Sequence, residues 1–282
     1  MTHRIRKLDS AECRTMVDWA AAEGWNPGHH DAHAFHATDP HGYWGLFDGD
    51  ALIATISAVR YPSDFVFIGF YICRPDRRGK GLGYRLWEHA LSDLAGSRVG
   101  LDGVVDQQAN YRKSGFVLAH RNIRCGGTPK LPAGRERTLR SLGGSDAASV
   151  AAFEQAKKLF PSDRTMFLRA WLSAPGTVAY AIDDGADLSA YGAIRPCRIG
   201  WKIGPLFAEN FDDALAITHA LLRAIPDGEQ VFLDVPEPNE EARRLATQFG
   251  LTQVFETARM YRGPAPNLAL HRIFGITSFE LG

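Results

Sequence analysis

The sequence predicts an α/β (α+β) protein of two related domains in tandem, each a mixed, mostly antiparallel sheet flanked by helices. Residues 4–125 alternate strand-like and helix-like segments in an order that a second stretch, residues 145–262, repeats. Between them, residues 125–137 are rich in glycine and proline, which is typical of a linker. A length of 282 residues suits two domains, and we place them at residues 1–130 and 131–282.

The composition argues against several classes of protein. Lysine and arginine total 32, as do aspartate and glutamate, and a formal net charge of zero argues against binding to nucleic acid or an anionic membrane. Cys13, Cys73, Cys125 and Cys197 have no paired spacing and read as reduced thiols. The polar first ten residues fit neither a signal peptide nor a membrane span. We expect a cytoplasmic monomer or homodimer with no nucleic-acid or membrane partner.

The first half is predicted to begin with a strand, two helices and three antiparallel strands. Asp9 or Ser10 is suited to cap the first helix. Asp48-Gly49-Asp50 lies between two apolar runs, which is a hairpin signal. The expected strands are residues 4–8, 43–47, 51–60 and 65–72, and the expected helices run to about residue 23 and over residues 31–37.

Residues 73–91 carry a basic, glycine-rich turn between the last of these strands and the helix that follows. The turn contains Arg77, Arg78, Gly79, Lys80, Gly81 and Gly83. Glycines let backbone N–H groups approach phosphate oxygens, and a helix start adds unpaired donors and the positive end of its dipole. The turn therefore predicts an anion-binding site, the alternative being a solvated basic turn.

The spacing within this turn distinguishes between nucleotide-binding families. The dinucleotide pattern fails because residue 86 is Leu, which disfavours an oxidoreductase, and the Walker pattern fails as well. Arg78, Gly81 and Gly83 form Arg-x-x-Gly-x-Gly, which resembles the pyrophosphate loop of the GCN5-related N-acetyltransferases (GNATs). The resemblance implies acetyl-CoA (coenzyme A) as acyl donor. The implied cofactor-binding residues are Tyr71, Ile72, Arg77, Arg78, Gly79, Lys80, Gly81, Leu82 and Gly83.

A second signature follows the next predicted strand, residues 98–105. Tyr111, Gly115 and Phe116 form Tyr-x-x-x-Gly-Phe, which resembles the closing signature of the same family, where the tyrosine protonates the departing CoA thiolate. Negative charge leaves on sulfur when an amine attacks a thioester, and a positioned phenol supplies the proton. Tyr111 is the expected general acid; the alternative is a tyrosine that packs at the edge of the core.

The second half repeats the order of elements without the basic turn. Its expected helices are residues 145–160, 163–172, 211–225 and 240–249; its expected strands are residues 177–182, 188–195, 198–207 and 231–235, and residues 250–262 close the unit. At the place of the turn, residues 204–214 contain no basic residue, and Glu209, Asp212 and Asp213 would repel a pyrophosphate. We expect this half to bind no CoA there and to cover the acceptor site or contribute to it.

Several stretches together resemble one two-domain branch of the family. They read GWNPG, QQANY, FLDVPEPN, ARMYRG and FGITSFELG, and they are similar to stretches of the YitH-type acetyltransferases. The resemblance implies two tandem GNAT-like domains, a catalytic one that binds acetyl-CoA followed by a divergent one. It names no acceptor, because kinship in fold does not carry a substrate.

The implied activity is direct transfer of an acetyl group to the amine of a small molecule. Trp25, Asn26 and Asp31 are expected at the acceptor site, since aromatic and acidic groups suit a cationic amine. Asp31, Asp39 and Glu23 are candidates for the base that takes the proton of the amine, and each of them suits a cap or a turn better than a base. Two alternatives remain open, a protein-lysine acetyltransferase and a non-catalytic acyl-CoA-binding regulator.

Four histidines, His29, His30, His33 and His36, cluster near the second helix. Their spacing permits a metal site, but it also fits a solvated helix face. Acetyl transfer to an amine needs no metal, and we expect none.

Overall fold

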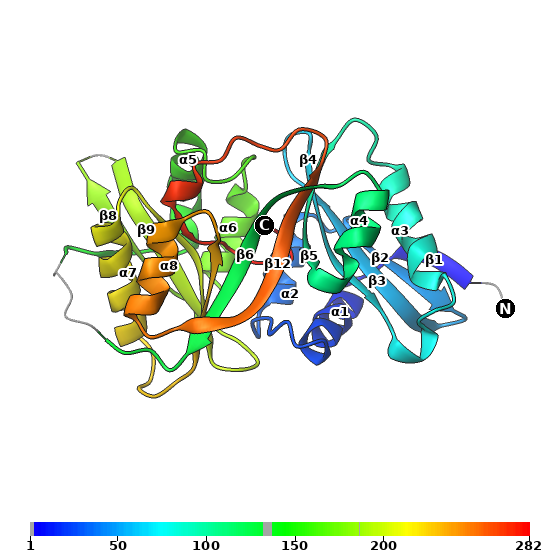
Figure 1. Ribbon diagram of the computed structural model, residues 1–282, viewed down its shortest axis with the longest axis horizontal. Helices are drawn as coiled ribbons and strands as arrows, with labels where there is room; N and C mark the ends of the chain where they lie inside the picture. The colour runs from blue at the N-terminus through cyan, green and yellow to red at the C-terminus, as the bar shows by residue number, and fades with distance from the viewer. Residues whose placement is uncertain (1–2, 132–136, 186) are drawn as a thin grey trace.

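The computed structural model describes residues 3–131, 137–185 and 187–282, which form one continuous sheet flanked by helices (Figure 1). The strand order is β1-β2-β3-β4-β5-β12-β6-β11-β10-β9-β8-β7, and β13 pairs with β10. The strands are β1 (His3–Lys7), β2 (Tyr43–Asp48), β3 (Ala51–Arg60), β4 (Phe65–Cys73), β5 (Arg98–Val104), β6 (Val117–Gly127), β7 (Arg140–Ser141), β8 (Val178–Asp184), β9 (Asp187–Pro196), β10 (Trp201–Ala208), β11 (Val231–Pro236), β12 (Thr252–Arg262) and β13 (Ile273–Gly275). The helices are α1 (Ser10–Ala22), α2 (Asp31–Thr38), α3 (Leu82–Ser92), α4 (Gln108–Lys113), α5 (Ala147–Ala156), α6 (Thr165–Leu172), α7 (Phe211–Arg223) and α8 (Glu240–Gln248).

The predicted fold class is confirmed, because two successive runs of strands and helices build a mixed, mostly antiparallel sheet. Local signals act as expected. The Asp9 side chain accepts hydrogen bonds from the N–H groups of Ala11 and Glu12, and the Glu12 carboxylate accepts from the N–H of Asp9, which is a capping box. Residues 132–136 of the predicted linker lie outside the described residues. Within the described ranges, every helix is too short or too polar to cross a bilayer.

The first half contains one parallel strand pair, and that pair ends early. β4 and β5 pair from Phe65 and Arg98 to Ile68 and Leu101. On its other side, β4 has an extra residue relative to β3, and Phe70 adopts a left-handed φ of 49° within this bulge. Bulges bend the strand that carries them. β4 therefore parts from β5 beyond Ile68 and leaves a split in the sheet.

The two halves exchange strands at the middle of the sheet. β12 comes late in the chain, yet it lies between β5 and β6, two strands of the first half. β6 in turn pairs with β11 of the second half. Figure 1 shows β6 and β12 side by side through the centre, with α3 and α4 to one side and α7 and α8 to the other. The halves therefore share one hydrogen-bonded sheet.

Residues 273–282, which we call the closing segment, are buried throughout between the two halves. β10 parts from β11 after Ile203, and there β13 of the closing segment pairs with β10. A Cβ on Gly204 would lie 2.7 Å from the carbonyl oxygens of Ile276 and Thr277. The closing segment therefore fills the split of the second half, and only glycine leaves room for it.

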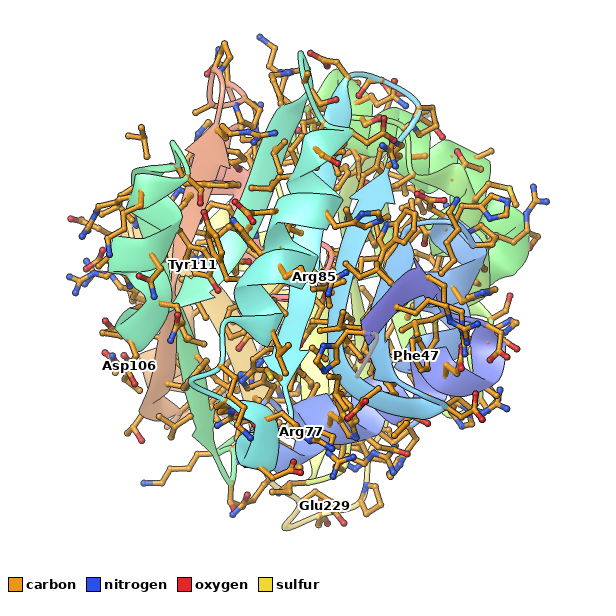
Figure 2. The ribbon with its side chains drawn as sticks, turned by 90° about the vertical axis from the view of Figure 1, so that its right-hand side faces the viewer. Phe47, Arg77, Arg85, Asp106, Tyr111 and Glu229 are labelled. Carbon is orange, nitrogen blue, oxygen red and sulfur yellow. The ribbon has the colours of Figure 1, made fainter. Side chains whose placement is uncertain are left out.

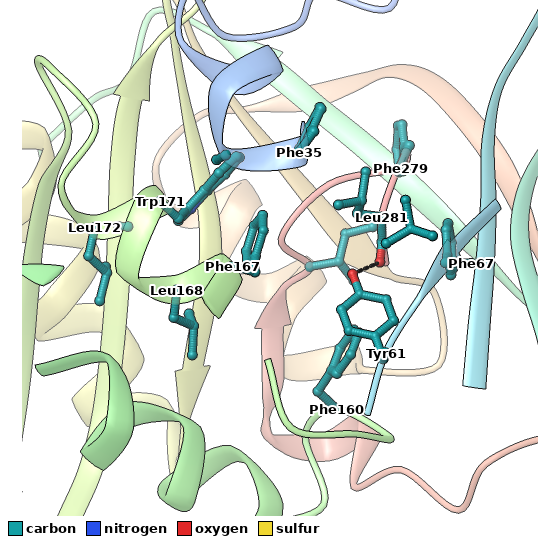
Figure 3. Packing of buried hydrophobic residues seen from close by; sticks show 14 of the residues in the cluster. Phe35, Tyr61, Phe67, Phe160, Phe167, Leu168, Trp171, Leu172, Phe279 and Leu281 are labelled. Carbon is teal, nitrogen blue, oxygen red and sulfur yellow. Dashed lines mark hydrogen bonds between the residues drawn. The ribbon is translucent and has the colours of Figure 1, made fainter. Parts of the chain in front are cut away.

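The closing segment then reaches the split of the first half. A Cβ on Gly69 of β4 would lie 2.3 Å from the carbonyl oxygen of Glu280, so the two backbones touch. The Tyr61 hydroxyl donates a hydrogen bond of 2.9 Å to the carbonyl oxygen of Leu281 (Figure 3). Phe279 and Leu281 are buried in the cluster that surrounds this contact.

One hydrophobic core covers the same face of the sheet in both halves. It takes residues from α1 and α2 of the first half and from α5 and α6 of the second. Phe35 of α2 stacks on Trp171 of α6 with ring centroids 5.9 Å apart (Figure 3). Two further clusters lie under α3 in the first half and under α7 and α8 in the second. Because the first core spans both halves, their relative position is set by apolar packing.

The segment between α1 and α2 binds to the second half through polar contacts. The Asn26 side chain donates to the carbonyl of Ile199 at 2.9 Å and accepts from its N–H at 2.8 Å. Asp31 forms a buried, bidentate ion pair with Arg195 at 2.8 and 3.0 Å. Burial alone would raise the pKa of Asp31, but Arg195 outweighs it and lowers that pKa. These two residues therefore serve the interface between the halves.

Replacing Asp31 by Ala should lower the free energy of unfolding by about 3–5 kcal/mol, because Arg195 would keep a buried charge without its partner. Calorimetry should show a fall in melting temperature of roughly 6 °C or more. Asp93→Ala is the matched control, since Asp93 pairs with Arg60 at 2.9 Å but its side chain is 86% exposed. Equal effects of the two substitutions would contradict a buried, structural ion pair at Asp31.

Candidate active site

A cleft of about 540 Å³ opens where the basic turn leads into α3. Eight of the nine residues predicted to bind the cofactor line it: Tyr71, Ile72, Arg77, Arg78, Gly79, Gly81, Leu82 and Gly83. The ninth, Lys80, points its Nζ toward the carbonyl oxygen of Asp76, 3.4 Å away. The rest of the lining is Glu23, Trp25, Cys73, Tyr84, Val104, Asp106, Gln107 and Phe255. The local sequence pattern thus assembles one wall of a cleft.

The turn before α3 has the backbone geometry of an anion site. Gly79 and Gly81 adopt left-handed φ values of 75° and 72°, which residues with a Cβ rarely adopt. Gly81 is the N-cap of α3 and offers no side-chain acceptor to the first N–H groups of the helix. Those N–H groups and the helix dipole are therefore available to a ligand anion at the cleft.

Two arginines of the turn are held by carboxylates. Arg78 donates to Glu23 at the end of α1 and, at 2.9 Å, to the carbonyl oxygen of Cys73. Arg77 pairs with Asp48 at 3.1 Å; Figure 2 shows Arg77 in the turn below α3. A diphosphate carries more negative charge than one carboxylate, so it would compete for these arginines.

A second cavity of about 70 Å³, the inner cavity, lies in the split between β4 and β5. Its lining comes from both halves: Trp25, Ile68, Gly69, Phe70, Tyr71, Leu101, Asp102, Val104, Gln107, Tyr111, Phe255, Thr257, Phe279 and Glu280. Five of these residues also line the cleft, namely Trp25, Tyr71, Val104, Gln107 and Phe255. The cleft and the inner cavity therefore adjoin.

Tyr111 of α4 lines the inner cavity and also packs in the core (Figure 2). A Cβ on Gly103 would lie 2.7 Å from two carbons of the Tyr111 ring, so the ring lies directly on β5. Trp87 flanks it with ring centroids 5.3 Å apart. Burial raises the pKa of Tyr111 further above neutral pH, where an ordinary phenol is already protonated. The Tyr111 ring therefore combines a packing position on β5 with a place in the wall of the inner cavity.

The three residues predicted at the acceptor site have different surroundings. Trp25 lines both the cleft and the inner cavity, and Arg124 donates to its carbonyl oxygen at 2.7 Å. Asn26 and Asp31 instead bond to the second half, as described above. Their contact with that half positions Trp25, which precedes them in the same segment.

The candidate bases are likewise separated. Glu23 lies in the cleft and is bonded to Arg78. Asp39 accepts hydrogen bonds from the N–H groups of His41 and Arg60, at 3.0 and 2.9 Å, and so stabilises a turn. Within the described part of the chain, no three histidine, cysteine, aspartate or glutamate side chains converge as a metal site would require.

Sequence reasoning missed two buried carboxylates that line the inner cavity. Asp102 of β5 accepts from Arg259 at 2.8 and 2.7 Å and from Asn122 at 2.8 Å, so its charge is compensated. Glu280 of the closing segment is 2% exposed, and its Oε1 has no hydrogen-bond partner among the described residues. The available signal for Glu280 was a single carboxylate within an otherwise apolar and small stretch, FGITSFELG.

Comparison with known proteins finds matches over both halves. Residues 4–116 match the model described as "Acetyltransferase (GNAT) family", and residues 153–275 match "Acetyltransferase (GNAT) domain". The chain is 31% identical over 271 residues to holothin acyltransferase from Pseudoalteromonas sp. (strain SANK 73390). That match covers 96% of the chain and 92% of the relative.

Two solved structures share the fold along nearly the whole chain. A putative acetyltransferase from Pyrococcus horikoshii has a TM-score of 0.84 at 20% identity, with 99% of this chain and 96% of that chain covered. A tandem GNAT protein from the clavulanic acid biosynthesis pathway has a TM-score of 0.63 at 16% identity, with 94% and 100% covered. At these identities the likeness concerns the fold alone.

Replacing Gly81 by Glu should weaken the binding of coenzyme A about tenfold or more, because it strains the N-cap of α3 and places a negative charge at the predicted diphosphate site. Isothermal titration measures the dissociation constant. Gly228→Glu is the matched control, since Gly228 also has a left-handed φ, 82°, and open space around its Cβ position. If Gly81→Glu binds coenzyme A as the wild type does, the turn is not the cofactor site.

Proposed function

Because the chain belongs to the GNAT superfamily of acyl-CoA-dependent N-acyltransferases, we propose that it transfers the acetyl group of acetyl-CoA to the amine of a small molecule by direct attack. One observation carries the proposal. The cleft at the basic turn adjoins a small inner cavity that holds a protonated tyrosine and is lined by both halves. Donor and acceptor would meet where the cleft adjoins the inner cavity.

The donor would bind along the turn and the free edge of β4. Backbone N–H groups from Arg78 to Gly83 would bind the diphosphate, and Arg77 and Lys80 would add charge. β4 pairs with β5 only as far as Ile68, so the backbone at Tyr71 and Ile72 is available to the pantetheine arm. A backbone N–H there would stabilise the oxyanion of the tetrahedral intermediate.

Tyr111 would act as general acid. As the tetrahedral intermediate collapses, the carbon–sulfur bond breaks and the sulfur takes the phenolic proton. A phenol is protonated at neutral pH, as the donor must be before the step, and burial, which raises the pKa of Tyr111, makes it a weaker acid than a free phenol. The alternative of an acyl-CoA-binding regulator predicts that loss of the Tyr111 hydroxyl has no consequence.

The acceptor would be a small amine enclosed by the two halves. Phe255, Phe279 and Glu280 of the second half complete the inner cavity together with Trp25. Aromatic faces and a carboxylate suit a cationic amine. The relative is named for acyl transfer to holothin, which supports an acceptor of that kind here. A protein-lysine acetyltransferase would need an open groove, and the lining from two halves favours the small molecule.

The second half would bind no CoA in the corresponding place. β13 fills the split between β10 and β11, and the segment before α7 has no basic residue. Titration with acetyl-CoA should therefore give one site per chain. Two sites would contradict the proposal that the second half serves only the acceptor, and no binding would contradict the proposed donor.

The activity itself is tested by incubation with acetyl-CoA and a panel of acceptors, with release of the CoA thiol as the readout. The panel contains holothin, a polyamine, an arylalkylamine, an aminoglycoside and a lysine-containing peptide. Acetylation of a small amine is the expected result. Acetylation of the peptide alone would support the protein-lysine alternative, and longer acyl-CoA donors test the preference for acetyl.

Tyr111→Phe should lower kcat by about 10²-fold or more while the dissociation constant of acetyl-CoA stays unchanged, because only the proton donor is lost. Steady-state kinetics and titration give the two quantities. Tyr180→Phe in β8 is the matched control for loss of a phenol. A Tyr111→Phe enzyme with wild-type kcat would leave Tyr111 a packing residue only.

A further inference from the structure

We infer that Glu280 of the closing segment is the general base that takes the proton of the acceptor amine. The inference rests on the proposed function, since it assigns a role in that same transfer. Its basis is geometric. Glu280 is a buried residue in the lining of the inner cavity, its Oε1 is shielded from solvent and has no hydrogen-bond partner among the described residues, and Tyr111 lines the same cavity.

The backbone around Glu280 is held on two sides. The Glu280 carbonyl oxygen lies against Gly69 of β4, where a Cβ would approach to 2.3 Å. Next to it, the Leu281 carbonyl accepts from Tyr61 at 2.9 Å. Phe279 packs on the other side, with the Arg124 guanidinium 4.6 Å from its ring centroid. A general base needs a fixed position relative to the group from which it takes a proton.

Four carboxylates line the cleft or the inner cavity, and Glu280 is the best placed of them to accept a proton from a bound amine. Glu23 is bonded to Arg78, and Asp102 is bonded to Arg259 and Asn122. Asp106 is exposed at the outer cleft. The two oxygens of Asp102 already accept hydrogen bonds, whereas Oε1 of Glu280 accepts none among the described residues.

The charges around Glu280 come from four elements. They are Lys202 of β10, Arg124 of β6, Arg195 of β9 and Asp31 of α2. Arg124 is paired with Asp234, Arg195 with Asp31, and the Lys202 Nζ donates to the carbonyl oxygen of Asn26 at 2.7 Å. Burial raises the pKa of Glu280, and Lys202 and Arg124 oppose that rise only in part. A base acts when deprotonated, so its contribution is lost as pH falls through this raised pKa.

The balanced step follows. The bound ammonium gives one proton to Glu280, and the neutral nitrogen attacks the thioester carbonyl carbon to form the nitrogen–carbon bond. The carbon–sulfur bond then breaks, and sulfur takes the proton of Tyr111. The second nitrogen proton returns through solvent to Tyr111, and Glu280 releases its proton to bulk water. The net products are the amide, the CoA thiol and one proton.

Glu280→Gln tests the assignment, because it keeps the shape and removes the base. With the acceptor that the wild type acetylates fastest, kcat/KM at pH 7 should fall about 10²–10⁴-fold, while the dissociation constant of acetyl-CoA stays unchanged. The deficit should shrink as pH rises and solvent deprotonates the amine. Glu237→Gln, a carboxylate at the exposed pair with Arg121, is the matched control.

Three outcomes would overturn the inference: wild-type kcat/KM for Glu280→Gln, a deficit equal at every pH, or an equal loss in Glu237→Gln. If Glu280→Gln does not fold, Glu280→Asp is measured instead. It should shift the acidic limb of the pH profile of kcat/KM, and an unshifted acidic limb would overturn the inference. Turnover by the wild type separates the two proposals. If the wild type acetylates an amine and Glu280→Gln keeps the wild-type kcat/KM, the proposed function holds and the role of Glu280 is wrong. If the wild type acetylates no amine, both proposals are wrong.

Discussion

The parting of β4 from β5 is the constraint on which the site depends. Two parallel strands stay hydrogen-bonded only while the distance between them is kept. The bulge at Phe70 bends β4 away, and the pairing of β4 with β5 ends at Ile68. Beyond it, the backbone of β4 has one edge without a strand partner, and unpaired backbone groups must be satisfied by something else. In the first half that partner is proposed to be the pantetheine arm of the donor. The basic turn, Tyr111 and the inner cavity are all arranged around this split.

The second half has the same parting between β10 and β11, and the chain satisfies it differently. β13 supplies the missing strand, and Gly204 allows the closing segment to pass at contact distance. The closing segment then continues to Gly69 of the first half. One stretch of ten residues therefore fills one split and helps to line the other, which gives two similar halves unequal roles. The exchange of β6 and β12 joins these halves further, because neither half has a complete sheet without a strand from the other.

Buried ion pairs and hydrogen bonds gather where the halves meet, and they engage polar residues that the sequence predicted at the acceptor site. Asn26 and Asp31 follow Trp25 in the same segment, and their polar side chains could bind a ligand. In the structure, however, Asn26 is hydrogen-bonded to Ile199 and Asp31 to Arg195, both in the second half. A buried charge needs an opposite charge or hydrogen bonds close by. Glu280 is the exception among these carboxylates, since one of its oxygens has no partner among the described residues.

The sequence by itself determined the local parts of the protein. The strand, the glycine turn with Gly79 and Gly81 in left-handed conformations, the helix after it and the capping box at Asp9 all follow from residues within a few positions of one another. Tyr111 was also singled out by a short signature, and the structure places it in the wall of the inner cavity. Only the tertiary structure decided that β12 lies between β5 and β6, that Asp31 pairs with Arg195, and that Glu280 reaches the inner cavity. Those contacts join residues more than 100 positions apart, and no periodicity or spacing in the sequence encodes which distant partner will compensate a buried charge or complete a sheet.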